Sequence, residues 1–478
     1  MQSSFGHFLS SRLSVSSCWL VARDNLGKSR NPTIGPLNKP TPSAPRLRLR
    51  KLLKNRLRKA FSRQGTIVGP SPMFRVAMIS PLPPQRTGES SYAAELIRGL
   101  DNTGSIRVFA ITGRDAKPLP TETGNTQIYR IWNGRSLTYP FRLLRAISRM
   151  RPHIVHVQFG PHGKVYGGFF GEPMLLLLIL FRAVGMKTTI TLHSTWMSEQ
   201  IVERVSRYKI VSRLSVLAPA LFRLYMRLLD FGTSSVQLST VRINSTLRKR
   251  FLNEWGFQER KVLEIPIPCR LPQKVLDRSR SLATLGLSGK KVILIFGFIR
   301  EGKGLEVALH AMDKVRETVP DSVLLIAGTP LDKNDSQYLR RLHESASSLP
   351  LSGVIRFDTR YIPEDEVSTY ISAASIVLLP YVESVGASGP AHDVAGYGVP
   401  IVASNAGHHM RESLGGHLVL FGTGNPEDMA DKLARLLTHP ESAATIGDRL
   451  RQYAITETWT LATKRTLANY RVTLRPSR

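Results

Sequence analysis

The sequence is short of cysteine, of acidic residues and of long apolar runs. Two of the 478 residues are cysteines, Cys18 and Cys269, and they lie too far apart to predict a disulfide framework or a zinc site. The longest apolar run, Pro173 to Phe181, ends at Arg182 and is far shorter than the ~20 residues that cross a bilayer. We therefore expect a protein of a reducing compartment, the cytoplasm, without a membrane-spanning segment.

The chain does contain enough apolar residues for substantial cores. Hydrophobic residues make up 42% of the sequence and aromatic residues 8%, a composition typical of globular rather than disordered proteins. At ~100–200 residues per domain, the length predicts two large domains or three small ones.

The formal net charge of +31 is concentrated at one end of the chain. Residues 1–72 contain fourteen Lys and Arg against a single acid, Asp24, which is over a third of the excess. This extension begins Ser- and Arg-rich, like an organelle transit peptide, and ends in the basic stretch RLRLRKLLKNRLRKAFSR. Three interpretations stay open: a disordered or artefactual extension upstream of Met73, an arm that lies on an anionic membrane, and a targeting segment.

From Phe74 onward, short β-branched runs alternate with helical patterns, which predicts parallel sheets covered by helices. A first series of strands is predicted at FRVAMIS, IRVFAIT, HIVHVQF, KTTITLH and SSVQLS, and a second at KVILIFG, SVLLIAG, VIRFD, SIVLLP and PIVAS. The stretch IPIPCRLPQKV separates them. The pattern predicts two doubly wound, Rossmann-like α/β domains, residues 73–270 and 271–455, with a ligand in the deep cleft between them, at the carboxyl ends of the strands.

Two positions in the first predicted domain follow strands. Gly88 lies in a Pro-rich turn before a helix, where glycine lets a ligand approach the backbone and the helix N-terminus suits an anion. His193 ends an apolar strand, where a catalytic or substrate-contacting group would lie, although a lone histidine there is more often structural. His156, inside IVHVQF, is interpreted as a core or supporting residue.

The loop after the first strand of the second series fits two mechanisms. Gly297 to Lys303 spell G-x-x-x-x-G-K, nearly the P-loop of nucleotide hydrolases, but position 304 is glycine and the magnesium-binding hydroxyl is missing. In the other interpretation, Arg300 and Lys303 are paired cations that neutralise a diphosphate without metal. An ordinary solvated basic loop is the third alternative.

The stretch ESVGASGPAHDVAGYGVP combines a small-residue loop with two acids, Glu383 and Asp393. The loop residues are small enough for their backbone N–H groups to surround a phosphate at the start of the next helix: Gly386, Ala387, Ser388 and Gly389. Carboxylates accept hydrogen bonds and suit hydroxyl groups. The stretch therefore predicts a sugar-nucleotide site, in which the cations and loop hold the diphosphate and the acids hold hydroxyls.

In order and spacing, these motifs together resemble a family four glycosyltransferase of the GT-B fold, a retaining family within the glycosyl transferases group 1. The resemblance runs from Met73 to the C-terminus and includes TLH, FGFIREGKGLE, LLIAG, YIPEDEVSTYISAASIVLLPY and WTLATKRTLANY. It implies transfer of a sugar from a nucleotide-diphosphate donor with retained anomeric configuration, no cofactor and no obligatory metal. We find no convincing D-x-D motif, and DKND at Asp332 is interpreted as a solvated helix start. The resemblance also implies that a final helix, within residues 456–478, returns to the first domain.

Carried over to this sequence, the family's basic pair is Arg300 and Lys303, and its sugar-contacting histidine is His193. Gly88 matches the glycine loop near the diphosphate. The family's two glutamates are separated by seven residues, whereas Glu383 and Asp393 are separated by nine. Either the loop is longer and Glu383 still reaches the sugar, or backbone and Ser388 replace that contact. Asp393 is expected on the ribose in both cases.

The acceptor is the least determined part of the prediction. The helical region SEQIVERVSRYKIVSRLSVLAPALFRLYMRLLDF mixes basic and apolar residues, as does a helix on anionic lipid, and an ordinary domain helix is the alternative. We expect an envelope, lipid-linked or glycan acceptor and a peripheral position on the inner face of the membrane. Rival predictions are a non-catalytic sugar-nucleotide or glycan-binding protein and, less compatible with the motifs, a nucleic-acid-binding protein; no specific nucleic acid is expected.

Overall fold

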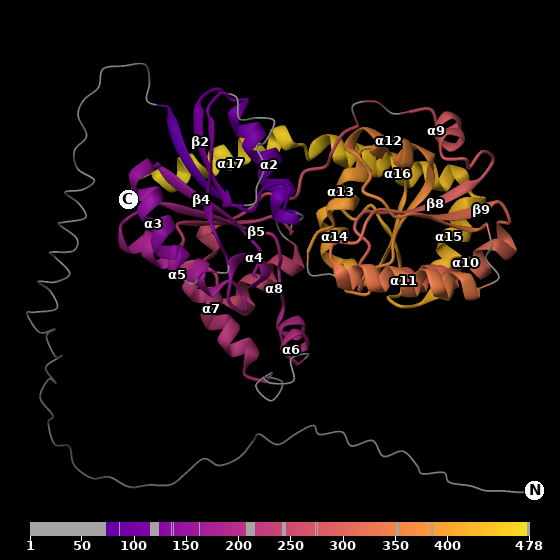
Figure 1. Ribbon diagram of the computed structural model, residues 1–478, viewed down its shortest axis with the longest axis horizontal. Coiled ribbons are helices and arrows are strands. Elements are labelled where there is room, and N and C mark those ends of the chain that lie inside the picture. Colours follow the sequence, from indigo (N-terminus) through magenta and orange to yellow (C-terminus); the bar gives the residue numbers. More distant parts are fainter. Residues whose placement is uncertain are drawn as a thin grey trace, which may run out of the picture. The chain divides into compact units, whose positions relative to one another are not determined.

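The computed structural model describes residues 73–475, with gaps at 86, 115–123, 135, 137, 162, 207–215, 241–244, 273, 275, 350–352 and 384–385. The predicted extension, residues 1–72, lies outside the described residues. Figure 1 shows the described part of the chain as strands and helices in sequence colours.

The first sheet has seven parallel strands in the order β3-β2-β1-β4-β5-β6-β7. The strands are β1 (Phe74–Ile79), β2 (Ile106–Gly113), β3 (Thr126–Trp132), β4 (Ile154–Phe159), β5 (Thr188–Leu192), β6 (Ser235–Leu238) and β7 (Val262–Glu264). The order reverses between β1 and β4, so the loops after these two strands diverge to opposite sides. This is the doubly wound arrangement expected from the sequence.

Helices cover both faces of this sheet because successive strand residues point to opposite sides. Ala77 and Ile79 pack on one side with α3 (Tyr139–Met150), α5 (Glu172–Ala183) and α7 (Ala218–Gly232), whereas Val76 and Met78 pack on the other with α2 (Gly88–Asp101). The helices of this part of the chain are α2 (Gly88–Asp101), α3 (Tyr139–Met150), α4 (Gly163–Tyr166), α5 (Glu172–Ala183), α6 (Ser198–Ser206), α7 (Ala218–Gly232) and α8 (Thr246–Trp255), followed by the 3-10 turn η2 (Glu259–Lys261).

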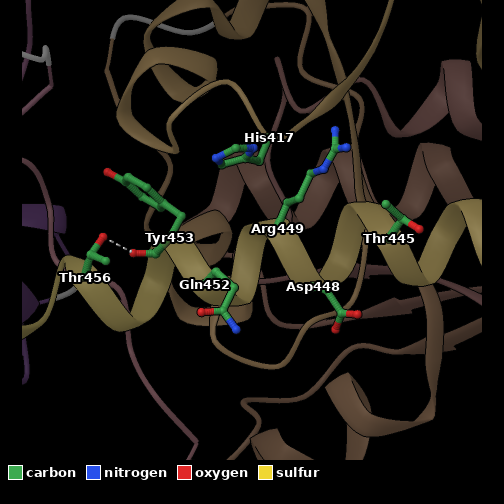
Figure 2. Close-up of a pocket in the computed structure, with 7 residues that line it drawn as sticks. All are labelled: His417, Thr445, Asp448, Arg449, Gln452, Tyr453 and Thr456. Atoms are coloured by element: carbon green, nitrogen blue, oxygen red, sulfur yellow. Dashed lines mark hydrogen bonds between the residues drawn. The ribbon is translucent and has the colours of Figure 1, made fainter.

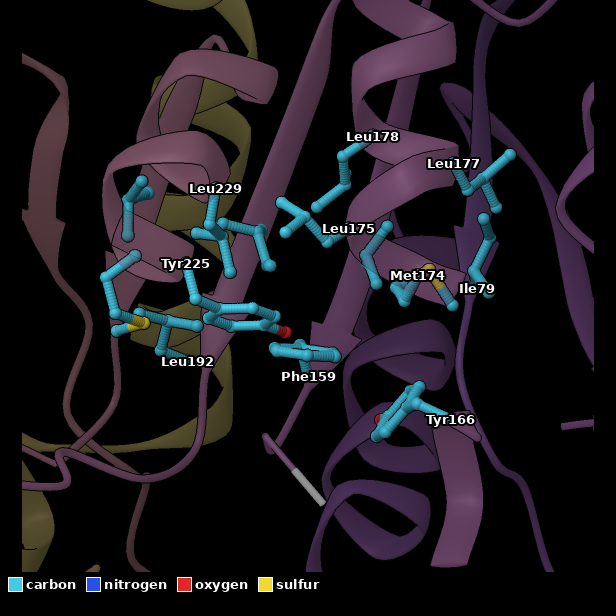
Figure 3. Close-up of a cluster of buried hydrophobic side chains, with 14 of the residues drawn as sticks. Ile79, Phe159, Tyr166, Met174, Leu175, Leu177, Leu178, Leu192, Tyr225 and Leu229 are labelled. Carbon is cyan, nitrogen blue, oxygen red and sulfur yellow. The ribbon is translucent and has the colours of Figure 1, made fainter. Parts of the chain in front are cut away.

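Figure 3 shows the core on the α5 and α7 side, where Phe159, Leu192 and Tyr225 lie close together. The apolar run Pro173 to Phe181, which was too short to span a bilayer, lies in α5 and buries most of its side chains in this core. Among the described residues, no helix combines the length and the apolar character that crossing a membrane requires.

The second sheet has six parallel strands in the order β10-β9-β8-β11-β12-β13. The strands are β8 (Lys291–Phe296), β9 (Ser322–Ala327), β10 (Ile355–Asp358), β11 (Ala374–Leu379), β12 (Ile401–Ser404) and β13 (Val419–Phe421). The helices are α9 (Arg278–Thr284), α10 (Leu305–Thr318), α11 (Lys333–Ser348), α12 (Glu364–Ala373), α13 (Gly389–Ala395), α14 (His408–Ser413), α15 (Pro426–Thr438) and α16 (Pro440–Thr456), with the 3-10 turn η3 (Asn405–Gly407) before α14.

The last helix, α17 (Trp459–Leu474), contacts elements of the first sheet. The Trp459 ring lies 5.1 Å from that of Tyr92 on α2, and Asn469 Nδ2 donates to Ser235 Oγ on β6 at 3.1 Å. These contacts link the end of the chain to its first half. The domain limits at residues 270 and 455 stay predictions.

The predicted fold class of two parallel, doubly wound sheets is confirmed, and all ten predicted strands are present. Three further strands, β3, β7 and β13, were missed. Outside positions 207–215, which the structure does not describe, the predicted basic helical region contains two helices, α6 and α7. Pro219 lies in the first turn of α7. Of the cations of this region, Arg207, Lys209 and Arg213 lie outside the described residues, while Arg204 lies over the Trp196 ring rather than on a solvated face.

Candidate functional site

The strand order of the second sheet reverses between β8 and β11, and the loops that follow these two strands contact each other. The backbone N–H of Val382 donates to the Gly302 carbonyl at 3.0 Å. Gly304 has φ +68°, and a Cβ there would lie 2.0 Å from the Pro380 carbonyl oxygen. Only glycine combines that backbone conformation with so close an approach. The two loops that carry most of the predicted site residues are therefore fixed at the place where open α/β sheets bind ligands.

Lys303 is the most unusual cation of these loops. Its Nζ lies 3.6 Å from the centroid of the Tyr381 ring, a cation–π arrangement. Burial lowers the pKa of Lys303 below the usual 10.5, and the nearby Arg300 adds to the decrease, while Tyr381 opposes it. Arg300 itself is exposed. The two predicted cations are thus close enough to repel, an arrangement that a bound anion would relieve.

Tyr381 connects this cation to the start of α13. Its hydroxyl lies 2.9 Å from Ser388 Oγ, and Ser388 caps the helix by accepting from the Ala391 N–H at 3.4 Å. Ser404 Oγ in turn donates to the Tyr381 carbonyl. The predicted small-residue loop therefore ends at a capped helix whose first turn lies beside Lys303.

The two predicted acids lie in different surroundings. Glu383 directly follows this loop contact and is exposed. Asp393, on α13, pairs with Arg270 Nε at 3.5 Å, and Arg270 also pairs with Glu95 at 3.7 Å and with Glu364. Burial raises the pKa of Asp393, and Arg270 opposes that rise. Asp393 is therefore held by a cation from the segment between the two sheets, and its role on a ribose stays a prediction.

His193 follows β5 of the first sheet. Its Nε2 lies 2.8 Å from Gln158 Oε1, and its ring meets Tyr92 edge-on at 4.7 Å between centroids. A Cβ built on Gly386 would lie 2.9 Å from the His193 carbonyl oxygen. The structure therefore brings together two predicted site residues that are almost two hundred positions apart in the sequence.

Gly88 is the first residue of α2, directly after the capping residue Thr87. Apart from the adjoining residues and the backbone of its own helix, no described heavy atom lies within 4 Å of the position that a Cβ of Gly88 would take. Packing does not require glycine here. The open space is what the predicted approach of a ligand to this backbone needs.

Behind His193 lies a buried polar network that the sequence analysis did not include in the site. His156 has Nδ1 at 2.6 Å from the Tyr470 hydroxyl and Nε2 at 2.7 Å from Thr191 Oγ1, and Gln158 Nε2 lies 3.2 Å from His156 Nε2. Burial lowers the pKa of His156 to about 3, so its ring is neutral near pH 7. The interpretation of His156 as a supporting core residue agrees with this position. The only sequence signal for Gln158 and Thr191 was that they are polar residues within otherwise apolar strands.

A surface hollow of about 530 Å³ lies elsewhere on the second half of the chain, along α16. Figure 2 shows the residues that line it, which include His417, Arg449 and Tyr453. None of the predicted site residues lines it. Among the described residues, no group of three or more His, Cys, Asp or Glu could hold a metal ion. Asp332 caps α11 by accepting from the N–H groups of Asn334 and Asp335, as expected for a solvated helix start.

Comparison with known proteins agrees with the resemblance. The family model described as Glycosyl transferases group 1 matches residues 290–439. A putative glycosyltransferase YtcC of Bacillus subtilis is 27% identical over 197 residues, which is 40% of this chain and 47% of that protein. A GDP-mannose-dependent alpha-(1-6)-phosphatidylinositol monomannoside mannosyltransferase of Mycolicibacterium smegmatis is 27% identical over 198 residues, 39% of this chain and 49% of that protein. The chain spans about half the length of the curated relatives it matches.

Similarity of structure extends further along the chain. The crystal structure of Anabaena Alr3699/HepE in complex with UDP and glucose matches with a TM-score of 0.63 at 13% identity, over 84% of this chain and all of that one. At this identity the match shows the fold. The structural match confirms the predicted GT-B fold with its two Rossmann-like sheets, and the family model supports the resemblance to the glycosyl transferases group 1 over residues 290–439.

Proposed function

From the match to the glycosyl transferases group 1 and from this geometry, we propose that the protein is a retaining glycosyltransferase. It transfers a sugar from a nucleotide-diphosphate donor to an envelope, lipid-linked or glycan acceptor, without a metal or cofactor. One observation carries the proposal: Lys303, Arg300 and the capped start of α13 converge where the strand order of the second sheet reverses.

The diphosphate would lie between the two cations and the first turn of α13. Lys303 is partly desolvated before any ligand binds, so its charge interacts strongly with an anion that arrives there. As the bond to the sugar breaks, negative charge grows on the diphosphate, and fixed cations stabilise that charge more than they stabilise the intact donor. Catalysis in this proposal comes from electrostatics and positioning.

The sugar and ribose would be held by the remaining predicted residues. Glu383 accepts from hydroxyls of the sugar, His193 contacts the sugar from the first sheet, and Asp393 accepts from the ribose. Gly88 leaves room for the diphosphate to approach the start of α2. Attack by the acceptor on the face from which the diphosphate leaves would retain the configuration, with a leaving-group oxygen taking the acceptor's proton.

The acceptor that we propose is lipid-linked or part of the cell envelope. The Mycolicibacterium relative is named for a phosphatidylinositol-based acceptor, which supports an acceptor at a membrane surface. A peripheral position of this protein on the cytoplasmic face of an anionic membrane belongs to the same proposal.

The test is thermal unfolding of the full chain in the presence of UDP-, GDP- and ADP-sugars and of ATP, each with and without magnesium. A ligand that binds only the folded protein raises the free energy of unfolding by about 2.7 kcal/mol at a hundredfold excess over Kd, and the unfolding midpoint rises with it. We expect one sugar nucleotide to stabilise the protein equally with and without magnesium, and Lys303→Ala to lose the effect. Stabilisation by ATP only with magnesium would instead support a P-loop hydrolase.

The altered spacing of Glu383 and Asp393 favours a second candidate, a sugar-nucleotide or glycan-binding protein without turnover. Release of nucleoside diphosphate from the stabilising donor distinguishes the two. Turnover above that of Lys303→Ala supports the transferase, and binding without release in the presence of varied acceptors supports the binding protein.

A further inference from the structure

The helix α7 exposes an apolar stripe. Large side chains recur on one face every three or four residues from the capping residue onward, and each is between 38% and 62% exposed: Leu217, Leu221, Leu224, Leu228 and Phe231. The opposite face is buried through residues such as Phe222 and Leu229. A surface helix normally places polar residues opposite its buried face. The exposed stripe therefore suggests a surface that meets something other than water.

The neighbouring helices extend this face and add positive charge. α5 contacts both α3 and α7, and all three bury their inner sides against the same face of the first sheet. Each of the two other helices also exposes a large apolar side chain, Phe141 on α3 and Leu176 on α5. The three helices contain six exposed arginines, Arg142, Arg145, Arg149, Arg182, Arg223 and Arg227.

Negative charge is nearly absent from this face. The three helices contain two acids, Glu172 and Asp230. Asp230 is buried and pairs with Lys261 at 3.3 Å, and Glu172 accepts from the backbone N–H groups of Phe169 and Phe170 at the start of α5. Arg182 lies 4.2 Å over the Phe231 ring, so a charged head borders the apolar stripe directly.

We infer that the outer face of α3, α5 and α7 docks on an anionic lipid bilayer. The α7 stripe inserts between head groups, and the surrounding arginines contact lipid phosphates while their stems cover apolar surface. We call this surface the α7 face: Leu217, Leu221, Leu224, Leu228 and Phe231 with the six arginines named above. The inference rests on the proposed function only in placing the enzyme beside its acceptor.

Charge complementarity favours a lipid bilayer over two other possible occupants of the α7 face, a second copy of the protein and its own residues 1–72. A second copy would bring the same arginines and a chain whose residues 73–478 have 52 basic and 34 acidic residues. The chain's own extension, residues 1–72, has fourteen basic residues and one acid. Both would add positive charge beside six arginines, whereas an anionic bilayer satisfies the leucines and the arginines together.

The first experiment measures co-sedimentation of the full chain with phosphatidylcholine vesicles that either contain or lack phosphatidylglycerol. We expect binding to the anionic vesicles, weakened by added salt because surface charges are screened. The double variant Leu221→Ser/Leu224→Ser should bind roughly tenfold more weakly or worse, because two exposed leucines no longer enter the bilayer. Val472→Ser is the matched control, since Val472 and Leu221 are both 62% exposed, and it should bind as the unaltered protein does.

A second measurement locates the contact independently of affinity. A polarity-sensitive dye is attached at Leu224→Cys in a Cys18→Ser background, and at Val472→Cys in a parallel sample; Cys269 is buried. Anionic vesicles should shift the emission of the dye at position 224 to the blue and leave the dye at 472 unchanged. Circular dichroism melts of all variants, without vesicles, check that each is folded.

Two results would overturn the inference. If folded Leu221→Ser/Leu224→Ser binds as tightly as the unaltered protein and the dye at 224 does not shift, lipid contact comes from elsewhere, such as residues 1–72. If light scattering shows a dimer that only the double variant dissolves, a second copy covers the stripe. Neither measurement uses a donor sugar. Failure of the docking surface would remove support for the peripheral membrane position but leave the sugar-transfer proposal intact, and failure of donor binding would leave the docking surface intact.

Discussion

Lys303 is a partly desolvated cation, and this position is the main support for the donor site that we propose. Its amine lies against the Tyr381 ring with a lowered pKa that is due first to burial and then to Arg300. A lysine that only kept a loop soluble would extend into water with an ordinary pKa. A bound diphosphate offsets the desolvation, so we interpret Lys303 as held ready for an anion.

The lowered pKa has a consequence for the pH dependence of binding. Because Lys303 in the free protein loses its proton at a lower pH than an ordinary lysine, its charge falls as pH rises toward 10.5. We expect nucleoside diphosphate affinity to decline on the alkaline side, measured by calorimetric titration, with a proton taken up on binding in that range. Lys303→Arg should bind without this decline, since arginine stays charged. An identical alkaline profile in Lys303→Arg would contradict the assignment.

Gly88→Ala distinguishes a role of Gly88 in packing, which affects stability, from a role in letting the donor approach, which affects turnover. No atom lies near the added methyl group, so the melting temperature should stay the same or rise slightly, as glycine in a helix costs about 0.5–1 kcal/mol relative to alanine. If the donor diphosphate approaches this backbone, donor turnover should fall at the same time, by tenfold or more for a clash of about 1.4 kcal/mol. Unchanged turnover in a stable Gly88→Ala protein would remove Gly88 from the site.

At the scale of single residues, the sequence was informative where a residue type is rare for its place. Neither a lysine such as Lys303 nor the run of small residues before Asp393 is required structurally at the end of a strand, so both indicated a site. In the structure, the small-residue loop lies against His193. Tyr381 and Gln158 could not be found, because a tyrosine after a strand and a glutamine inside one have ordinary structural uses. Their association with the candidate site is visible only from the contact of Tyr381 with Lys303 and of Gln158 with His193.

At the scale of elements, α17 is joined to the first sheet through a buried histidine. His156 has its pKa lowered to about 3 by burial, so the unfolded chain takes up a proton below about pH 6.5 that the folded chain refuses. Stability should therefore fall as pH drops from about 6.5, by on the order of 1.4 kcal/mol per pH unit for this group. Denaturant unfolding midpoints of the unaltered protein and His156→Gln between about pH 7 and pH 5 test this. His156→Gln should be less stable than the unaltered protein at about pH 7, and its stability should fall less between about pH 7 and pH 5. If the stability of both proteins falls by the same amount with pH, His156 is not the group responsible.

The contact of α17 with α2 depends on Gly99. A Cβ there would lie 2.3 Å from Thr463 Oγ1, so Gly99→Ala should separate the two helices and lower stability by about 1–3 kcal/mol, as other overpacked contacts do. Differential scanning calorimetry of Gly99→Ala and of the double variant Gly99→Ala/Thr463→Ala provides the check. Removing the threonine side chain should restore most of the loss; no restoration would mean that the glycine matters for another reason.

Elements with strong periodicity were predictable, whereas three of the four edge strands, β3, β7 and β13, were not. β7 and β13 have three residues each, too few to show a period, and β3 is a half-exposed edge strand whose polar residues interrupt its apolar pattern. The single helical region predicted around residues 198–232 is two helices in the structure. The exposed leucine face of α7 could not be deduced from the sequence. The helix has apolar residues on both faces, and only the structure shows which face packs on the sheet.

At the scale of the whole molecule, two doubly wound sheets on one chain were predicted from alternating strands and helices, and the structural comparison supports the same architecture. The pairing of Asp393 with Arg270 was not predicted, because it depends on how the segment between the sheets folds back. The excess of positive charge allowed two predictions, binding to an anionic membrane and binding to nucleic acid.

If residues 1–72 alone attract nucleic acid, their removal should abolish binding of a labelled oligonucleotide in a gel-shift assay. Binding that is retained without them would assign it to residues 73–478.

Hydrogen–deuterium exchange shows where the donor binds, on which the proposed function depends. The full chain is exchanged with and without the sugar nucleotide that stabilises it in the thermal assay. We expect slower exchange in the loops after β8 and β11, residues 297–304 and 380–391, and no change along the α16 hollow that contains His417 and Arg449. Protection at that hollow, or protection nowhere despite bound ligand, would contradict the site proposed for this protein.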